Sequence, residues 1–555
     1  MEDNILFEKI KQAQNDIDKM DMIRLIQDEK IKETAIYLLE DDNNKLLMAE
    51  TLKKEDAKAR LYTKLIKKDE MIDSTIEAVK KLKSQKYALF CLKGMSKDNY
   101  QKKVNAIADL LVYGKKADDN SRESVAYTLK IMYNKMHIDN PDYTFLDFLS
   151  IIENDYTIAS VIANVSNPLQ FEEFDTRHPI DGLPTTREDK KNLLVAIKDK
   201  NVRKQIELVY LSRDELVNTL DTNSISLIGL PEDMTVGVEL EAEGELSCAF
   251  NGLRICDNWQ AKGDASLEKG IEVVSPILHD SLEDMTDLSM VCQIMKQCEL
   301  STSDRCGGHI HIGSKYLDTK EAFGNFLTLW LANEESIYRM CNSSGESFRE
   351  GTDHYAKPIS LLYENGDENI FSDISNAKTR DELVGIIKNF QKGHNNGLNT
   401  DNINYEENDT IEFRISNGTL NFEEIQNNIR LYGRLMQRSK EVSLLQAKLE
   451  SGQEVSEIEQ KKINGFENLC NQQYKTEEKG QMLIDFLFEE DEREPYISRY
   501  KSSRENSEPL KKMFSKDAYK KLYTVLNPKD KNFSATISSL NDSKTNERED
   551  EEIEQ

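Results

Sequence analysis

Three segments in the middle of the chain alternate apolar and polar residues with a period of two. They are 236–241 (Val-Gly-Val-Glu-Leu-Glu), 309–312 (His-Ile-His-Ile) and 410–416 (Thr-Ile-Glu-Phe-Arg-Ile-Ser). A shorter segment, 271–276, has the same character and carries Glu272. Because successive side chains of a β-strand point to opposite faces, each segment predicts a strand with one buried apolar face and one polar face.

The polar positions of these strands are rich in ionisable side chains. An ordinary solvated strand face mixes Thr, Lys, Ser and Gln, whereas these positions hold Glu239, Glu241, Glu272, His309, His311, Glu412 and Arg414. Carboxylates gathered on one face repel one another unless cations neutralise them. A solvated face is the better explanation of any single segment, but four such segments together favour a cation-binding face.

Glutamate and histidine ligands without a cysteine pattern suit hard divalent cations, so we expect Mg²⁺ or Mn²⁺. Zinc is the alternative, because a His-x-His pair on a strand is able to bind it. The cupin version of that arrangement has a Glu four or five residues later, where this chain has Lys315 and Tyr316. The sequence contains no Walker A loop, dinucleotide glycine fingerprint or Gly-x-Ser-x-Gly elbow.

The first 115 residues have a helical pattern and are almost free of Gly and Pro. An apolar residue followed by a charged turn recurs with spacings of 13, 13, 14 and 16 residues, at Ile26, Leu39, Leu52, Ile66 and Leu82. Each spacing leaves room for about ten residues of amphipathic helix. Stacked helical hairpins of this kind form a short α-solenoid that binds partners, and a plain helical bundle is the equally weighted alternative.

Turn-forming residues at 222–235 mark a change from helices to strands, which predicts an α+β protein of several regions. The expected regions are a repeat-like helical region at 1–115, a helical connecting region at 116–225, a strand-rich domain at 226–450, a helical C-terminal extension at 451–540 and a disordered acidic tail at 541–555. The strand-rich domain should also contain helices over about 281–299, after a cap at Asp318 or Thr319, and after Asn421, where Glu424 would complete a capping box.

Composition narrows the class of protein. The 555 residues carry a net charge of −28, which argues against a broad surface for nucleic acid or for an anionic membrane. The eight cysteines form no Cys-x-x-Cys pair and are expected to be reduced. The first residues lack a basic segment followed by an apolar core, and no apolar stretch approaches the roughly 18 residues of a membrane span. We therefore expect a soluble cytoplasmic protein.

Five ordered motifs resemble the amidoligase family, which belongs with glutamate–cysteine ligase and glutamine synthetase in the carboxylate–amine ligase superfamily. The motifs are 236–241, 264–267 (Asp-Ala-Ser-Leu), 270–276 (Gly-Ile-Glu-Val-Val-Ser-Pro), 306–312 (Cys-Gly-Gly-His-Ile-His-Ile) and 410–421. Arg349, the turn at 355–358 and the loop around Asn399 also resemble family positions. The likeness covers roughly 230–440, and it departs from the family pattern at Ala265, where the family tends toward Gly.

The resemblance implies an ATP-dependent ligase on a curved antiparallel sheet of the glutamine-synthetase type with flanking helices. ATP would phosphorylate a substrate carboxylate, and an amine would then displace phosphate from the acyl phosphate and leave an amide. The implied metal ligands are Glu239, Glu241, Glu272, His309 and Glu412. By the same resemblance, His311, Arg414 and Lys262 would contact the nucleotide, Arg414 would stabilise charge on the transferring phosphoryl group, Arg349 would bind the substrate carboxylate, and Asp264 would position or deprotonate the amine.

Two other functions remain open at this point. One is an ATP-dependent phosphotransferase on the same fold, which would release ADP without an amine acceptor. The other is a non-catalytic scaffold in which the N-terminal helices bind partners. Because a free amino acid would hardly need a helical array, we expect the ligase substrate to be a peptide or protein, and homo-oligomers are expected because related ligases often assemble.

Overall fold

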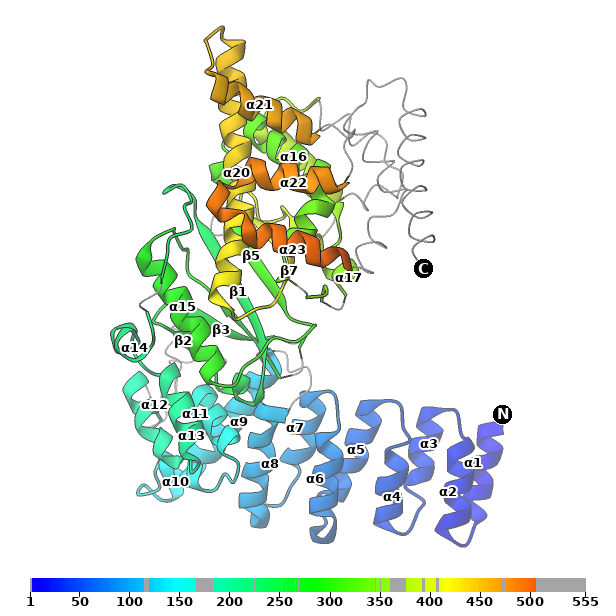
Figure 1. Cartoon of the computed structure of the whole chain (residues 1–555). Coiled ribbons are helices and arrows are strands. Elements are labelled where there is room, and N and C mark those ends of the chain that lie inside the picture. The colour runs from blue at the N-terminus through cyan, green and yellow to red at the C-terminus, as the bar shows by residue number, and fades with distance from the viewer. Residues whose placement is uncertain are drawn as a thin grey trace, which may run out of the picture. The chain divides into compact units, whose positions relative to one another are not determined.

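The fold is seen in a computed structural model of the chain (Figure 1). It describes residues 2–113, 119–165, 183–184, 186–222, 225–250, 252–264, 266–267, 269–344, 346–349, 351–359, 376–391, 395–405, 409–470 and 476–505. The predicted acidic tail at 541–555 lies outside the described residues.

The strands of the described residues form one open seven-stranded sheet in the order β2-β3-β4-β1-β5-β7-β6. They are β1 (Val236–Glu243), β2 (Arg254–Ile255), β3 (Trp259–Asp264), β4 (Gly270–Val274), β5 (Gly307–Gly313), β6 (Leu398–Asn399) and β7 (Thr410–Asn417). The pairs β1–β5, β5–β7, β6–β7 and β2–β3 are antiparallel. The four predicted strands are therefore present as β1, β4, β5 and β7, and the predicted α+β class is confirmed.

The chain divides into two compact units that interleave along the sequence. The first comprises Met1–Leu220, Ala242–Val273 and Gln293–Ser301, and the second comprises Asp221–Glu241, Val274–Cys292 and Thr302–Gln555. The first unit thus holds most of the helices together with β2, β3 and β4, while the second holds β5, β6 and β7.

The first unit begins with short helices, as the sequence predicts. Its α-helices are α1 (Glu2–Gln12), α2 (Asp16–Leu25), α3 (Glu29–Ile36), α4 (Asp42–Ala49), α5 (Glu55–Leu65), α6 (Ile72–Lys80), α7 (Gln85–Lys93), α8 (Tyr100–Tyr113), α9 (Asp119–Asp139), α10 (Phe145–Ser150), α11 (Asp155–Val165), α12 (Arg187–Leu193), α13 (Lys200–Val209) and α14 (Arg213–Thr219). Its 3-10 helices are η1 (Asp69–Met71), η2 (Lys97–Asn99), η3 (Leu194–Ala196) and η4 (Glu245–Ala249).

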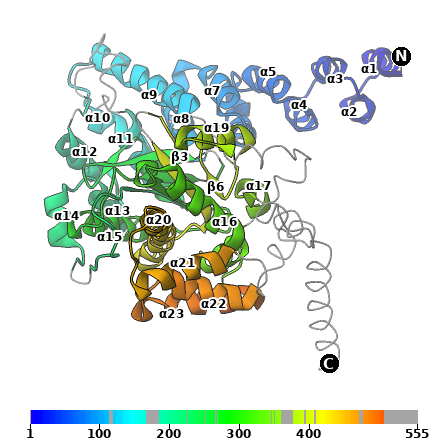
Figure 2. The ribbon, with the colours of Figure 1, turned by 90° about the horizontal axis from the view of Figure 1, so that it is seen from above.

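From α1 to α7, each helix has its main contacts with helices one or two places away along the chain (Figure 2). Stacked helical hairpins contact one another in this way. The five apolar residues that begin the recurring sequence blocks are all buried at the ends of helices or in the turns after them: Ile26, Leu39, Leu52, Ile66 and Leu82. The turns between helices are therefore part of the apolar core.

One contact recurs along these helices. A carboxylate in the first turn of a helix accepts hydrogen bonds from the backbone N–H groups of the turn that precedes the next helix but one. Asp3 binds the turn at 27–28, Asp16 the turn at 40–41, Glu29 the turn at 53–54 and Glu55 the turn at 83–84. Each carboxylate thus supplies acceptors for backbone donors that have no partner within their own helix.

The second unit contains most of α15 and all of the helices that follow it. These helices are α15 (Leu282–Gln297), α16 (Lys320–Met340), α17 (Thr352–Tyr355), α19 (Arg380–Gln391), α20 (Phe422–Glu450), α21 (Glu457–Cys470), α22 (Thr476–Leu487) and α23 (Glu494–Glu505), with the 3-10 helices η5 (Ser314–Tyr316) and η7 (Glu490–Glu492). Phe413 of β7 stacks on Tyr432 of α20 with ring centroids 4.3 Å apart, and it also contacts Phe326 and Trp330 of α16. The predicted aromatic face of α16 is thus core, and Thr319 caps that helix.

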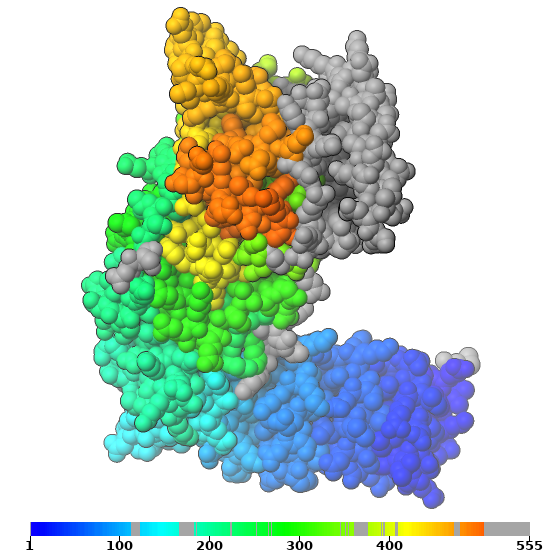
Figure 3. Space-filling model, in the orientation of Figure 1, coloured from blue at the N-terminus to red at the C-terminus, as the bar shows by residue number. Residues whose placement is uncertain are grey.

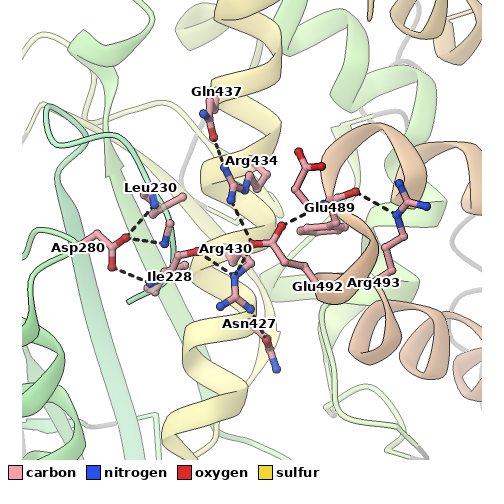
Figure 4. A network of polar contacts seen from close by, with 12 residues as sticks. Ile228, Leu230, Asp280, Asn427, Arg430, Arg434, Gln437, Glu489, Glu492 and Arg493 are labelled. Carbon is pink, nitrogen blue, oxygen red and sulfur yellow. Dashed lines mark hydrogen bonds and ion pairs between the residues drawn. The ribbon is translucent and has the colours of Figure 1, made fainter. Parts of the chain in front are cut away.

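The C-terminal helices α21, α22 and α23 pack against α16. A polar network joins α20 to η7 within the same unit (Figure 4). Arg434 contacts Glu492 at 3.1 Å, and Arg430 donates to the carbonyl oxygen of Ile228 at 3.0 Å. The carboxylate of Asp280 accepts from the backbone N–H groups of 228, 229 and 230. The network therefore fixes the chain segment that leads into β1.

Two local expectations are wrong. Glu424 does not close a capping box with Asn421; it pairs instead with Arg499 of α23, while Asn421 caps the helix through the backbone N–H of Glu423. Ser416 does not lie on the polar face of β7, because a β-bulge between the pairs of Ile310 and Gly308 shifts the register. Its hydroxyl lies 2.6 Å from that of Tyr432, beneath the sheet.

Among the described helices, none combines the length and the apolar composition that crossing a bilayer requires.

Candidate functional site

Strand pairing in the second unit brings the polar positions of three strands side by side. Glu239 of β1 lies opposite His309 of β5. His311 of β5 lies opposite Glu412 of β7, and Glu412 lies opposite Asn399 of β6. Because residues directly opposite on antiparallel strands have neighbouring side chains, the register alone assembles a cluster of carboxylates and imidazoles.

The opposite face of these strands is apolar and buried, which holds the polar cluster in place. Its residues are each at most 3% exposed: Val236, Val238, Leu240, Ile310, Ile312, Ile411 and Phe413. A shift by one residue in any of these strands would move this apolar set onto the polar face, so the register is strongly specified.

Both imidazoles contact carboxylates. His309 Nδ1 lies 3.0 Å from Glu239 Oε2, and its Nε2 lies 3.7 Å from Glu241 Oε1. His311 Nε2 lies 3.2 Å from the other oxygen of Glu239, and its Nδ1 contacts Thr410 Oγ1 at 3.1 Å. Glu239 therefore bridges the two histidines.

These contacts set the protonation of the cluster. Burial raises the pKa of Glu239, but its contacts with His309 and His311 outweigh burial, and the net pKa is lowered. Burial lowers the pKa of His311, but Glu239 and Glu412 outweigh it, and the net pKa is raised. Burial likewise raises the pKa of Glu412, and the charge of Arg414 is the main cause of its net lowering. The carboxylates therefore stay ionised, as metal ligands must.

Neighbouring groups orient the buried carboxylates. Asn399 Nδ2 donates to Glu412 Oε2 at 2.7 Å, and the guanidinium of Arg414 donates to the other oxygen of Glu412. The backbone N–H of Gly307 donates to Glu241 Oε2 at 2.6 Å. Glu241 and Glu412 are thus held in fixed orientations by hydrogen bonds from their neighbours, as the outer hydrogen-bond partners of metal ligands hold those ligands.

Arg349 lies beside this cluster and is only 5% exposed. It donates to the carbonyl oxygen of Arg414 at 3.0 Å, and its own backbone N–H donates to Asn417. A Cβ atom on Gly307 would stand 1.9 Å from one guanidinium nitrogen, so the glycine makes room for the arginine. Burial lowers the pKa of Arg349, opposed by the charge of Glu241. Its Nε has no hydrogen-bond partner among the described residues.

The donor set suits a divalent cation. One oxygen each of Glu239 and Glu412 and one nitrogen of His311 all lie within 4.8 Å of one another. The Nε2 atom of His309 is buried and has no hydrogen-bond partner among the described residues. A buried nitrogen without a partner is costly, and a metal ion would satisfy it. Carboxylates with imidazoles fit Mg²⁺ or Mn²⁺, and these ligands also leave zinc possible.

Three of the residues proposed from the resemblance lie in the first unit. Glu272 lies on β4, and its Oε2 lies 3.6 Å from Lys262 Nζ of β3. Asp264 ends β3, and its side chain accepts from the backbone N–H of Ser266 at 2.7 Å. The roles assigned to these three residues stay predictions.

Sequence reasoning did not assign roles to Asn399, Thr410 and Gly307, which support the cluster. Asn399 stands in a two-residue strand, too short for a pattern of alternation. The Gly307-Gly308 pair before the first histidine was a usable signal, because glycines in a strand often mark close approach of another group.

Comparison with known proteins gives one match. Residues 232–436 match the family model described as "putative amidoligase enzyme". Neither the curated proteins nor the solved structures contain a match. The matched region contains β1, β5 and β7 with every residue of the cluster, and it supports an amide-bond-forming enzyme. Over residues 232–436 the chain is therefore similar to the amidoligase family.

Proposed function

We propose that the protein is an ATP-dependent carboxylate–amine ligase that forms an amide or isopeptide bond through an acyl phosphate. Mg²⁺ or Mn²⁺ would be bound by Glu239, Glu241, His309 and Glu412. His311, one nitrogen of which lies within 4.8 Å of ligand oxygens of Glu239 and Glu412, would stand between the metal and the nucleotide phosphates, and Arg414 would face those phosphates. The preferred substrate is a carboxylate on a peptide or protein.

The observation that carries the proposal is the meeting of three glutamates, two histidines and Arg414 on three adjacent strands of the segment that matches the amidoligase model, with Arg349 beside them. A solvated sheet face has no reason to bury Glu241, Glu412 and His309 below a tenth of their exposed surface. Buried carboxylates beside buried imidazoles are typical of a site that binds cations.

The proposed reaction has two steps. An oxygen of the substrate carboxylate attacks the γ-phosphorus of ATP, the bond to the β,γ-bridging oxygen breaks, and ADP leaves. The amine nitrogen then attacks the carbonyl carbon of the acyl phosphate, inorganic phosphate leaves with the bonding electrons, and the nitrogen loses a proton. The bound metal would supply positive charge to the phosphate oxygens in the first step.

The arginines supply the remaining positive charge. Arg414 is held by Glu412 and is placed to stabilise charge on the transferring phosphoryl group. Arg349 keeps a buried Nε donor that has no hydrogen-bond partner among the described residues, which suits a substrate carboxylate. Glu272 as a further metal ligand, Lys262 as a nucleotide contact and Asp264 as the group that positions the amine remain part of the proposal.

Isothermal titration calorimetry with ATP tests the site, with and without Mg²⁺. The wild-type protein should bind MgATP, and Glu239→Gln should bind it at least tenfold more weakly, because the substitution removes one negative charge and keeps the shape of the side chain. Glu321→Gln, at an exposed position of α16, is the matched control and should bind like the wild type. Magnesium-independent binding, or equal binding by Glu239→Gln, would contradict the proposal.

A second assay separates ligation from phosphoryl transfer. The release of ADP is measured with candidate carboxylates in the presence and absence of an amine, and the amide product is detected by mass spectrometry. A ligase releases phosphate and forms product only with the amine present. A stable phosphorylated product without an amine would identify a phosphotransferase.

A further inference from the structure

The positive charge of this acidic protein is concentrated in one stretch. Residues 51–103 contain 15 Lys and Arg against seven Asp and Glu, a net charge of +8, whereas the whole chain has a net charge of −28. Residues 2–50, which form the preceding helices, contain seven Lys and Arg against 13 Asp and Glu, a net charge of −6. The excess therefore belongs to the part of the first unit from α5 to the start of α8.

Within this stretch, the exposed sides of α5 and α7 carry the cations. Arg60, Lys64 and Lys67 are spaced as one side of a helix and the turn that follows it, and all three are exposed. Lys86 and Lys93 of α7 are exposed in the same way. The opposite sides of both helices are buried: Ala57, Leu61 and Leu65 in α5, and Ala88, Leu89 and Leu92 in α7.

These cations form one surface with aromatic side chains among them. Lys64 Nζ stands 3.9 Å from the ring centroid of Tyr37, the residue directly after α3, and α5 packs against α7. Phe90 lies between the two lysines of α7 and is 55% exposed. We call this surface the basic face; its residues are Tyr37, Arg60, Lys64, Lys67, Lys86, Phe90 and Lys93. It belongs to the blue region of the space-filling view (Figure 3).

Carboxylates near the basic face already form ion pairs. Arg60 pairs with both Glu33 and Asp56. Among the described residues, no carboxylate pairs with Lys67, Lys86 or Lys93. Two lysines that face the even-numbered helices are neutralised by carboxylates. Lys68 pairs with Asp42 of α4, and Lys102 of α8 pairs with Asp73 of α6. Lys67, Lys86 and Lys93 thus place unneutralised charge on the layer of α5 and α7.

We propose that the basic face binds an acidic polypeptide segment of a partner protein. Its cations are exposed and spread over two adjacent helices, so they suit an extended row of carboxylates. The attraction acts over a distance of about 10 Å, the Debye length at about 0.1 M salt. Phe90 and Tyr37 offer apolar contacts to the aliphatic parts of the same segment. A nucleic acid is disfavoured because the net charge of the whole chain would repel its phosphates. In combination with the proposed ligase, and resting on it, this makes an acidic protein the substrate class.

Fluorescence anisotropy with a labelled 20-residue poly-L-glutamate peptide tests the basic face on the full chain. The triple variant Lys67→Glu, Lys86→Glu, Lys93→Glu should bind the peptide about tenfold more weakly than the wild type. The matched control is Lys198→Glu, Lys200→Glu, Lys204→Glu, which makes the same charge change at exposed positions of the first unit and should bind like the wild type. Circular dichroism confirms that both variants are folded.

If both triple variants lost the same affinity for the peptide, the net charge of the protein alone would explain the effect, and the proposal would be overturned. Equal binding of a poly-L-glutamine peptide, or tighter binding of a 20-nucleotide single-stranded DNA, would overturn it as well. The MgATP titration on the basic-face variant keeps the two proposals apart. Peptide binding without MgATP binding would contradict the ligase and leave the basic face standing, and the reverse result would contradict only the basic face.

Discussion

Asn399 donates its side-chain N–H to Glu412 at 2.7 Å across the β6–β7 pair, and both side chains are almost fully buried. Since Arg414 holds the other oxygen of Glu412, this carboxylate has one orientation available to it. The amide also favours the ionised carboxylate, which contributes to the lowered pKa of Glu412.

Asn399→Leu should therefore weaken metal binding without removing a ligand. We expect an affinity for Mn²⁺ reduced about 10- to 100-fold, as for other outer partners of metal ligands. The free energy of unfolding should fall by about 1–3 kcal/mol, because a buried acceptor loses its donor. Electron paramagnetic resonance titration of free Mn²⁺ measures the first effect and urea unfolding the second. Asn192→Leu, exposed on α12, is the control; unchanged Mn²⁺ binding in Asn399→Leu would show that Glu412 does not depend on its amide partner.

Gly307→Ala should displace Arg349. The new Cβ would stand 1.9 Å from a guanidinium nitrogen and 2.7 Å from His309 Nε2, and neither side chain has free space because both are buried. We expect a folded protein, less stable by about 1–3 kcal/mol, with the ligase activity reduced at least 100-fold.

Gly324→Ala provides the contrast, because a Cβ at this position of α16 meets no atom within 4 Å. Alanine is the better helix former, so this variant should gain about 0.5–1 kcal/mol and keep full activity. Thermal unfolding and the rate of ADP release measure both variants. Equal activity of the two would mean that Arg349 has no role in the reaction.

Asp280→Ala should loosen the segment that leads into β1. Three backbone N–H groups at 228–230 would lose their acceptor, at a cost of about 1–3 kcal/mol. Hydrogen exchange followed by mass spectrometry should show faster exchange at 228–230 and little change in α19. Asp233→Asn, at an exposed position of the same segment, should leave exchange unchanged. Protection at 228–230 in Asp280→Ala equal to that of the wild type would contradict the role of the network in Figure 4.

Lys190→Met should stabilise the protein. The ammonium of Lys190 is buried and donates to the carbonyl oxygen of Ala163, and burial lowers the pKa of Lys190 from 10.5 to about 8. The pKa shift means that burying the charged ammonium costs the wild type about 3 kcal/mol of stability at pH 7. The variant avoids this cost but loses a hydrogen bond worth about 1 kcal/mol, so we expect a net gain in stability of about 2 kcal/mol.

The gain should depend on pH in a defined direction. Between about pH 8 and pH 10.5 the unfolded lysine binds more protons than the folded one, so the stability of the wild type rises with pH in this window. The advantage of Lys190→Met should therefore be largest below pH 8 and shrink toward pH 10.5. Urea unfolding at pH 7 and pH 9.5 measures it. Lys191→Met, beside it and paired with Glu215 at the surface, should change stability by less than about 1 kcal/mol at either pH. An advantage that does not fall with pH would rule out burial of charge as its cause.

The strands and their polar faces are predictable from the sequence, because the alternation of apolar and polar side chains is a local property. Glu239, His309 and Glu412 were therefore identifiable before their contacts were known, and the register that joins them follows from keeping Val238, Ile310 and Phe413 in one core. What the sequence does not carry is the β-bulge that sends Ser416 beneath the sheet, since a bulge depends on the pairing partner.

Other parts of the site depend on long-range packing. Asn399 reaches Glu412 through a strand of only two residues, and Glu424 leaves its expected cap because Arg499, 75 residues later, offers a charge. A pattern of neighbouring residues in the sequence does not predict a partner that is distant along the chain. The resemblance to the amidoligases was needed to single out Arg349, whose surroundings contain no periodic signal.

The recurring carboxylate contact of the N-terminal helices constrains how this region is able to change in length. In the first three instances each acid binds a turn 24 and 25 residues further along, so the contact joins α1, α2 and α3 each to the next helix but one. An insertion or deletion of one complete helical hairpin, about 26 residues, would leave each remaining acid opposite an equivalent turn. The gain or loss of a single helix would exchange the two rows of helices beyond that point, so acids near it would no longer face the turn to which they bind. Gene segments encoding whole hairpins are therefore the units by which this region would be lengthened or shortened in evolution or by design.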